Sequence, residues 1–94
     1  MIELNNVNDQ IILTILSDVE KCSNFLLEKN ETDFTKHSLI ILENSIYHSS
    51  GLFTHLKSEI EDICWGLASK NPDYKKLSSS FKENCIKYCR TYMT

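Results

Sequence analysis

The chain has 94 residues, of which 41% are hydrophobic and 24% carry a charged side chain. This length suffices for a single domain, residues 1–94, and the ordinary charged content argues against a disordered chain. No run of about 18 uninterrupted apolar residues, which a membrane span needs, is present. The first residues lack the basic start and apolar run of a signal peptide, so we expect a cytoplasmic protein without a membrane partner.

Charge is divided unevenly along the chain, whose net charge is −3. Residues 1–69 contain 4 basic and 11 acidic side chains, whereas residues 70–94 contain 6 basic and 2 acidic ones. Only one residue is Arg, the side chain that best recognises bases and phosphates, so nucleic-acid binding is not expected. The abundance of Ile, Asn and Lys fits an AT-rich genome, such as that of a bacterium or phage.

Helix-stopping residues are rare, since the whole chain has two Gly and one Pro. A first helix is predicted over residues 8–29. Its apolar residues recur every three or four positions, which is the pattern of a helix with one buried face. They are Ile12, Ile15, Leu16, Val19, Cys22 and Leu26.

Residues 33–70 fit two different folds. Their apolar residues continue in steps of three and four, with only Ser49 interrupting the row. The row contains Leu39, Leu42, Ile46, Phe53, Leu56, Ile60, Ile63 and Leu67. Either the chain turns at residues 49–51, which gives four helices, or one long helix, kinked at most, crosses the segment, which gives three. The unbroken register favours the long helix, because a turn normally shifts the phase of the apolar residues.

The clearest stop lies at residues 69–73, because a residue that precedes proline avoids helical geometry. Pro72 then suits the first turn of a last helix. The apolar positions of this helix are Tyr74, Leu77, Phe81, Cys85, Tyr88 and Tyr92. The predicted fold is therefore all-α, a small antiparallel bundle of three to four helices.

No catalytic, cofactor or metal motif emerges from the sequence. His48 and His55 would lie about 10 Å apart along one helix, too far to share a metal ion. The four cysteines lie on or beside apolar stripes, where we expect reduced and unreactive thiols. We therefore expect no enzyme activity, no metal and no cofactor, with a cysteine-based metal or redox sensor kept as an alternative.

Two sets of surface side chains are predicted to bind partners. Trp65 lies on the far side of its helix from the apolar row, and Tyr47 lies beside that row. Trp65 either packs under the first or last helix or is exposed, and if it is exposed we predict that it and Tyr47 are interface anchors. An acidic face of the same helical segment accompanies them, with the residues Glu59, Glu61 and Asp62. The second set lies on the basic last helix and would hold a small anion; it contains Lys75, Lys76, Lys82 and Arg90.

These features favour a small cytoplasmic protein that acts by surface binding to another protein rather than by catalysis. Inhibitors, immunity-type proteins, antitoxins and adaptor or accessory subunits all fit this description. A homodimer is expected as well, above all if an unbroken central helix needs a second copy to cover its apolar row. The alternative is an oligomeric bundle that sequesters a small anionic ligand.

Overall fold

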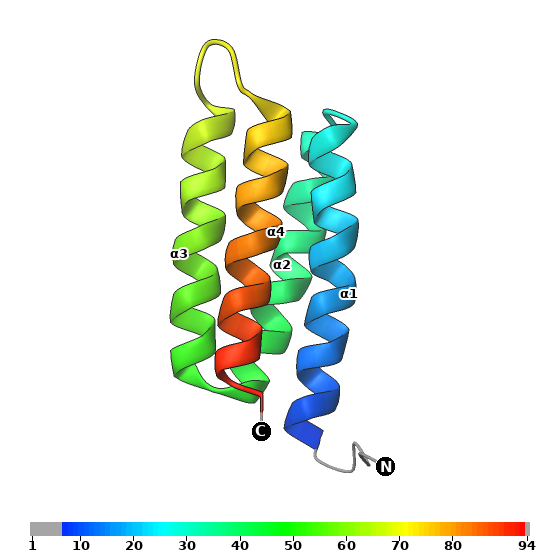
Figure 1. Cartoon of the computed structure of the whole chain (residues 1–94), viewed down its shortest axis with the longest axis vertical. Coiled ribbons are helices and arrows are strands. Elements are labelled where there is room, and N and C mark those ends of the chain that lie inside the picture. The colour runs from blue at the N-terminus through cyan, green and yellow to red at the C-terminus, as the bar shows by residue number, and fades with distance from the viewer. Residues whose placement is uncertain (1–6, 94) are drawn as a thin grey trace.

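The computed structural model describes residues 7–93, which form a bundle of four helices (Figure 1). The helices are α1 (Val7–Leu27), α2 (Glu31–His48), α3 (Ser50–Leu67) and α4 (Tyr74–Thr91). The prediction of an all-α bundle is confirmed for this part of the chain. The first helix ends at Leu27 rather than at residue 29. The expectation about a signal peptide rests on residues 1–6, which lie outside the described residues.

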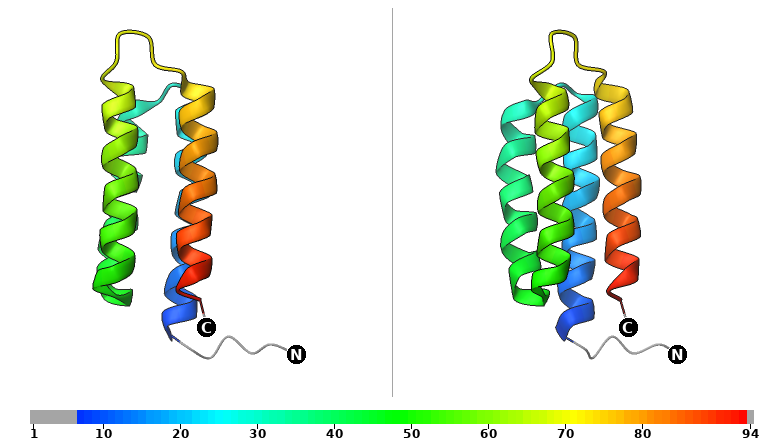
Figure 2. Two further views of the ribbon diagram at one scale, coloured as in Figure 1. Left: turned by 60° about the vertical axis from the view of Figure 1, so that its left-hand side comes forward. Right: turned by 90° about the vertical axis from the view of Figure 1, so that its left-hand side faces the viewer.

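Each helix packs against the next one in the chain, and α4 returns to pack against α1. The colour gradient of Figure 1 shows that successive helices run in opposite directions along the long axis. Figure 2 shows that the bundle has two layers, one of α1 and α4 and the other of α2 and α3. The bundle is elongated, with extents of 46 × 25 × 20 Å, so each helix runs along most of its length.

The central segment is two helices, so the alternative with a turn at residues 49–51 is observed and the favoured alternative, one long helix over 33–70, is wrong. Ser49 is the single residue between α2 and α3, and its backbone is extended, with φ −171° and ψ 153°. Its Oγ accepts a hydrogen bond of 3.2 Å from the backbone N–H of Leu52, which caps the start of α3. Because one residue makes the turn, the three-and-four spacing passes across it almost unchanged, and the register could not reveal the break.

Gly51 allows this turn to lie against the end of α4. A Cβ atom at Gly51 would clash with the hydroxyl group of Tyr92. The ring of Tyr92 also meets the ring of His48 edge to face, with 5.9 Å between their centroids. The α2–α3 turn and the end of α4 therefore pack as one unit.

The core takes side chains from all four helices. Phe34 of α2 and Phe81 of α4 meet edge to face at 5.4 Å, across the diagonal of the bundle. Around them lie further side chains that have no solvent exposure: Ile12, Ile15, Leu26, Ile41, Leu52 and Leu56, with the thiols of Cys22, Cys85 and Cys89. The buried rows predicted for the first and last helices supply many of these residues.

The buried face of α2 differs from the predicted one. Leu39 and Ile46, both assigned to the core from the sequence, are 61% and 60% exposed. The buried residues of α2 are Phe34, Ser38, Ile41 and Ser45. Both serine hydroxyl groups donate 2.8 Å hydrogen bonds to carbonyl oxygens of their own helix, so they are buried without an unpaired donor.

Contacts with α1 explain this rotation of α2. The ring of His37 packs on Phe25 of α1 with 5.1 Å between centroids, and its Nδ1 lies 3.7 Å from Oδ1 of Asp18. Successive residues of a helix are about 100° apart, so Leu39 lies about 200° around the helix from His37. With His37 facing α1, Leu39 points away from α1 and out of the core.

A matched pair of leucine substitutions tests this description of the core. Leu56→Ala should lower the free energy of unfolding by about 2–5 kcal/mol, because it leaves a cavity at a fully buried position. Leu39→Ala removes the same atoms from an exposed position and should change the free energy of unfolding by less than about 0.5 kcal/mol. Urea denaturation of both variants measures the difference. Equal losses would contradict the observed rotation of α2.

Candidate protein-binding surface

One helix carries most of the large hydrophobic side chains that the described part of the chain exposes. They form what we call the α2 surface: Leu39, Ile40, Ile46 and Tyr47. Leu39 and Ile46 are seven residues apart, as are Ile40 and Tyr47, so each pair lines up along the helix. The two rows lie about 100° apart around the helix with the exposed Glu43 between them, and together they make a broad surface rich in apolar side chains.

Trp65 extends the apolar exposure onto α3. It is 78% exposed, more than any other large hydrophobic side chain in residues 9–93. A shallow hollow beside it is lined by Ile60, Glu61, Cys64 and Trp65. Leu39 and Ile60 lie 10 and 11 residues from Ser49 on opposite arms of the α2–α3 hairpin. Leu39 and Ile60 are therefore at a similar position along the long axis of the bundle. The α2 surface and the hollow thus belong to the same layer, formed by α2 and α3 (Figure 2).

The predicted acidic set divides into one buried and two exposed carboxylates. Glu59 is only 6% exposed, so its assignment to an exposed acidic face was wrong. Its Oε1 accepts a 3.1 Å hydrogen bond from Nδ2 of Asn84 in α4. Burial raises the pKa of Glu59, and nearby Asp62 raises it further, while the hydrogen bond from Asn84 opposes both effects. Glu61 and Asp62 are exposed, one helical turn before Trp65.

The predicted basic set is spread over the whole length of α4. Lys75 and Lys76 lie in its first turn and Arg90 in its last, about 20 Å away at 1.5 Å per residue. Lys82 is paired with Glu20 of α1, with 2.8 Å between Nζ and Oε2. The structure therefore brings no two distant members of this set together.

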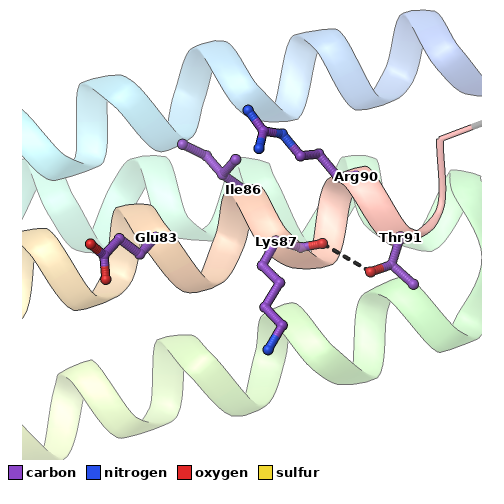
Figure 3. A pocket seen from close by; sticks show the side chains of 5 residues that line it. All are labelled: Glu83, Ile86, Lys87, Arg90 and Thr91. Carbon is purple, nitrogen blue, oxygen red and sulfur yellow. Dashed lines mark hydrogen bonds between the residues drawn. The ribbon is translucent and has the colours of Figure 1, made fainter.

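A hollow on α4 includes one member of the basic set. It is lined by Glu83, Ile86, Lys87, Arg90 and Thr91. Figure 3 shows Arg90 directed toward α1 and Lys87 directed toward α3, while Thr91 donates a 3.0 Å hydrogen bond to the carbonyl oxygen of Lys87. The two cationic groups diverge, so they do not form a joint cradle for a small anion.

Three of the four cysteine thiols are buried and one is exposed. Burial raises the pKa of Cys22 to about 12 and that of Cys89 to about 11, and it raises the pKa of Cys85 as well. These thiols stay protonated at neutral pH and are poor nucleophiles. Cys64 is exposed beside Trp65, a placement that the sequence analysis missed, and partial burial raises its pKa, with a smaller effect from Glu61.

The α2–α3 turn brings two histidines to the same end of the bundle, which the sequence did not predict. His55 stacks on Tyr88 with 4.8 Å between ring centroids, and both His48 and His55 pack on Tyr92. Nδ1 of His48 also lies 3.0 Å from Oγ of Ser49. Nowhere in residues 7–93 do three or more His, Cys, Asp or Glu side chains group so that they could hold a metal ion.

Comparison with known proteins found no family model, no curated protein and no solved structure that matches this chain. None of the four helices in the described residues combines the length and the hydropathy needed to cross a membrane.

Thiol titration should separate Cys64 from the three buried cysteines. With an aromatic disulfide reagent at neutral pH, we expect one thiol to react in the folded protein and three more only after denaturant is added. Cys64→Ser should abolish the fast phase and leave the slow phase unchanged. Any fast-reacting thiol in the Cys64→Ser variant would contradict the burial of the other three.

The raised pKa of Glu59 predicts how stability depends on pH. The folded chain binds a proton at Glu59 more readily than the unfolded chain, where the pKa is near its ordinary 4.5. The free energy of unfolding should therefore fall as the pH rises from 4.5 through the raised value.

Glu59→Gln should remove this penalty and keep the acceptor for Asn84. We expect the variant to be at least as stable as the parent chain at pH 7, with the difference shrinking toward pH 4. Glu61→Gln, at an exposed position, serves as the control and should leave the pH profile unchanged. Denaturation between pH 4 and 7 measures the free energy of unfolding of each chain. The assignment would be refuted if the parent chain became more stable relative to the Glu59→Gln variant as the pH rises.

Proposed function

We propose that this chain is a small protein-binding protein that acts by covering a surface of another protein, without catalysing a reaction. The observation that carries the proposal is the α2 surface. α2 exposes Leu39 and Ile46 while it buries Ser38 and Ser45 on its other side. Complete burial of a Leu or Ile side chain contributes about 1.5–3 kcal/mol, so a partner that covers this surface gains a substantial driving force.

Two exposed aromatic side chains support the same proposal. Tyr47 is 69% exposed and belongs to the α2 surface, and Trp65 lies beside the hollow of α3. Tyr and Trp are enriched among the residues that dominate binding energies at protein interfaces. Inhibitors, antitoxins, immunity-type proteins and adaptor subunits all act in this way, by occupying a surface.

A partner of different sequence fits the surface better than a second copy does. The argument for a homodimer was strongest for an unbroken central helix, whose apolar row would need a cover. The break at Ser49 folds α3 back against α2, and most of the α3 part of that row enters the bundle core. The exposed residues of α2 and α3 are also acidic overall, so a symmetric pairing of these faces would bring like charges together.

The test compares two double variants with matched chemistry. Leu39→Ser with Ile46→Ser removes two anchors of the α2 surface, whereas Leu13→Ser with Leu27→Ser removes two exposed leucines of α1. Partners captured from the source cells by the parent chain are identified by mass spectrometry, and their affinity is then measured by calorimetry. The α2 variant should bind at least roughly tenfold more weakly, while the α1 variant should bind normally.

A partner that binds both double variants equally well would contradict the proposal. Circular dichroism melts of both variants serve as the check on folding, since all four positions are exposed. Sedimentation velocity of the free chain reports in parallel whether a second copy occupies the surface.

A further inference from the structure

We propose that the partner presents a basic amphipathic helix to the layer formed by α2 and α3, with an Arg or Lys side chain seated in the hollow beside Trp65. This inference rests on the proposed function and adds the chemistry of the partner. It follows from three features of the layer: its shape, its charges and the composition of the hollow.

The shape of the layer suits a helix. α2 and α3 pack side by side along the long axis of the bundle, and neither is covered on its outer side by α1 or α4 (Figure 2). Two adjacent helices form a lengthwise depression into which the side-chain ridges of a third helix can pack. Partner helices that bind in this way present apolar anchors three, four and seven residues apart, and the α2 surface has the same spacing.

Carboxylates are interleaved with the exposed hydrophobic side chains. Glu43 lies three or four residues from every member of the α2 surface, so it stands at the centre of that surface. On α3, Glu61 and Asp62 stand four and three residues before Trp65. The two exposed aromatic side chains of the layer, Tyr47 and Trp65, therefore each have a carboxylate one turn away.

The cations of this layer do not balance these carboxylates. α2 and α3 contain two lysines, Lys36 and Lys57, and Nζ of Lys57 lies 4.0 Å from Glu61. Their exposed or half-exposed carboxylates are Glu31, Asp33, Glu43, Glu61 and Asp62. The layer thus attracts positive charge, whereas α4 on the other layer is basic. Complementary charge of this kind speeds association and selects among partners.

The hollow beside Trp65 has the composition of a site for one long cationic side chain. Ile60 and Cys64 offer apolar contact for the methylene stem of an Arg or Lys. The exposed indole ring of Trp65 attracts a cation to its face, and the carboxylate of Glu61 lies at the same hollow to pair with it. A neutral apolar side chain would leave Glu61 with no counterion closer than Lys57, whose Nζ is 4.0 Å away on the exposed surface.

A second copy of the chain cannot offer both apolar contacts and positive charge to this layer while forming a symmetric, closed oligomer. Symmetric pairing of two α2–α3 layers places Glu43, Glu61 and Asp62 opposite a like-charged surface. Pairing of this layer with the basic α4 of another copy is head to tail, and such contacts continue into open assemblies unless the rotation closes them. A basic helix from another protein avoids both problems.

Three synthetic peptides test the proposal on the intact chain. Each is an 18-residue helix former without Trp, with the same leucine face, and its flanking positions are all Arg, all Gln or all Glu. Trp65 is the only tryptophan of the chain, so its emission reports binding at the hollow directly. The Arg peptide should shift the emission and bind more tightly than the Gln peptide, with an affinity that falls as salt is added. The Glu peptide should bind most weakly.

A charge-removing variant locates the effect. Glu61→Gln with Asp62→Asn should weaken binding of the Arg peptide roughly three- to tenfold and leave the Gln peptide unchanged. Glu28→Gln with Glu83→Gln makes the same change in net charge at exposed positions outside the layer. This control should bind the Arg peptide as the parent chain does.

The possible results distinguish the basic-helix partner from the function on which it rests. Equal binding of the Arg and Gln peptides, or equal weakening by both charge variants, would overturn the basic-helix partner. The basic-helix partner is equally overturned if no peptide changes the Trp65 emission, or if the free chain dimerises through this layer. In any of these cases, loss of the native partner in Leu39→Ser with Ile46→Ser would still support the proposed function, and retention of that partner would refute both.

Discussion

The rotation of α2 about its own axis determines which of its side chains are exposed and which enter the core. Two contacts set that rotation: His37 against Phe25 and Asp18 of α1, and Phe34 against Phe81 of α4. Both place the small residues Ser38 and Ser45 toward the interior, where their hydroxyl groups bond to their own helix. A different rotation would bury Leu39 and Ile46, and it would also move Phe34 away from the centre of the core. The apolar surface of α2 is thus a consequence of how the core is packed.

The two layers of the bundle differ in how they are held together. α1 and α4 are joined by a buried hydroxyl pair, with 2.6 Å between the Oγ atoms of Ser23 and Ser78, and Ser78 also bonds to the carbonyl oxygen of Ser23 at 2.8 Å. The salt bridge between Lys82 and Glu20 joins the same two helices at the surface. α2 and α3 share a one-residue turn and carry the exposed hydrophobic side chains. Polar contacts thus hold α1 and α4 together, and the exposed hydrophobic side chains of the proposed binding face lie mainly on the other layer.

The sequence predicts the helices well and the face of α2 poorly, for a physical reason. In α3 a single row has the three-and-four spacing with large side chains, and its members Leu56, Ile60 and Ile63 are buried as expected. In α2 two rows have that spacing: one with Leu39, Leu42 and Ile46, the other with Phe34, Ser38, Ile41 and Ser45. Hydrophobicity alone selects the first row, but tertiary contacts select the second, because serine can satisfy its hydroxyl group within its own helix.

Other parts of the site depended on neighbours that the sequence pattern does not identify. The sequence pattern groups Glu59 with two exposed carboxylates, yet Glu59 lies on the α4 side of α3 and is buried beside Asn84. The turn at Ser49 escaped detection because one extended residue hardly disturbs the spacing of the flanking helices. Trp65 and Tyr47 lie at the surface, but the sequence left open whether Trp65 packs under another helix, because Ile41 lies off the apolar row and is buried whereas Leu39 lies on it and is exposed. The role of Trp65 and Tyr47 as anchors remains a prediction.

An exposed apolar surface also has to be prevented from binding to copies of itself. Glu43 lies within one turn of Leu39, Ile40, Ile46 and Tyr47, so any close approach to the α2 surface must accommodate its negative charge. A second copy that approaches in the same orientation brings an identical carboxylate and is repelled, and an acidic or purely apolar partner leaves the carboxylate without a counterion. A basic helix offers both the apolar contact and the counterion. In the proposed complex Glu43 would therefore oppose pairing with a second copy and favour a basic partner, which places the hydrophobic anchors and the source of selectivity on a single helical surface.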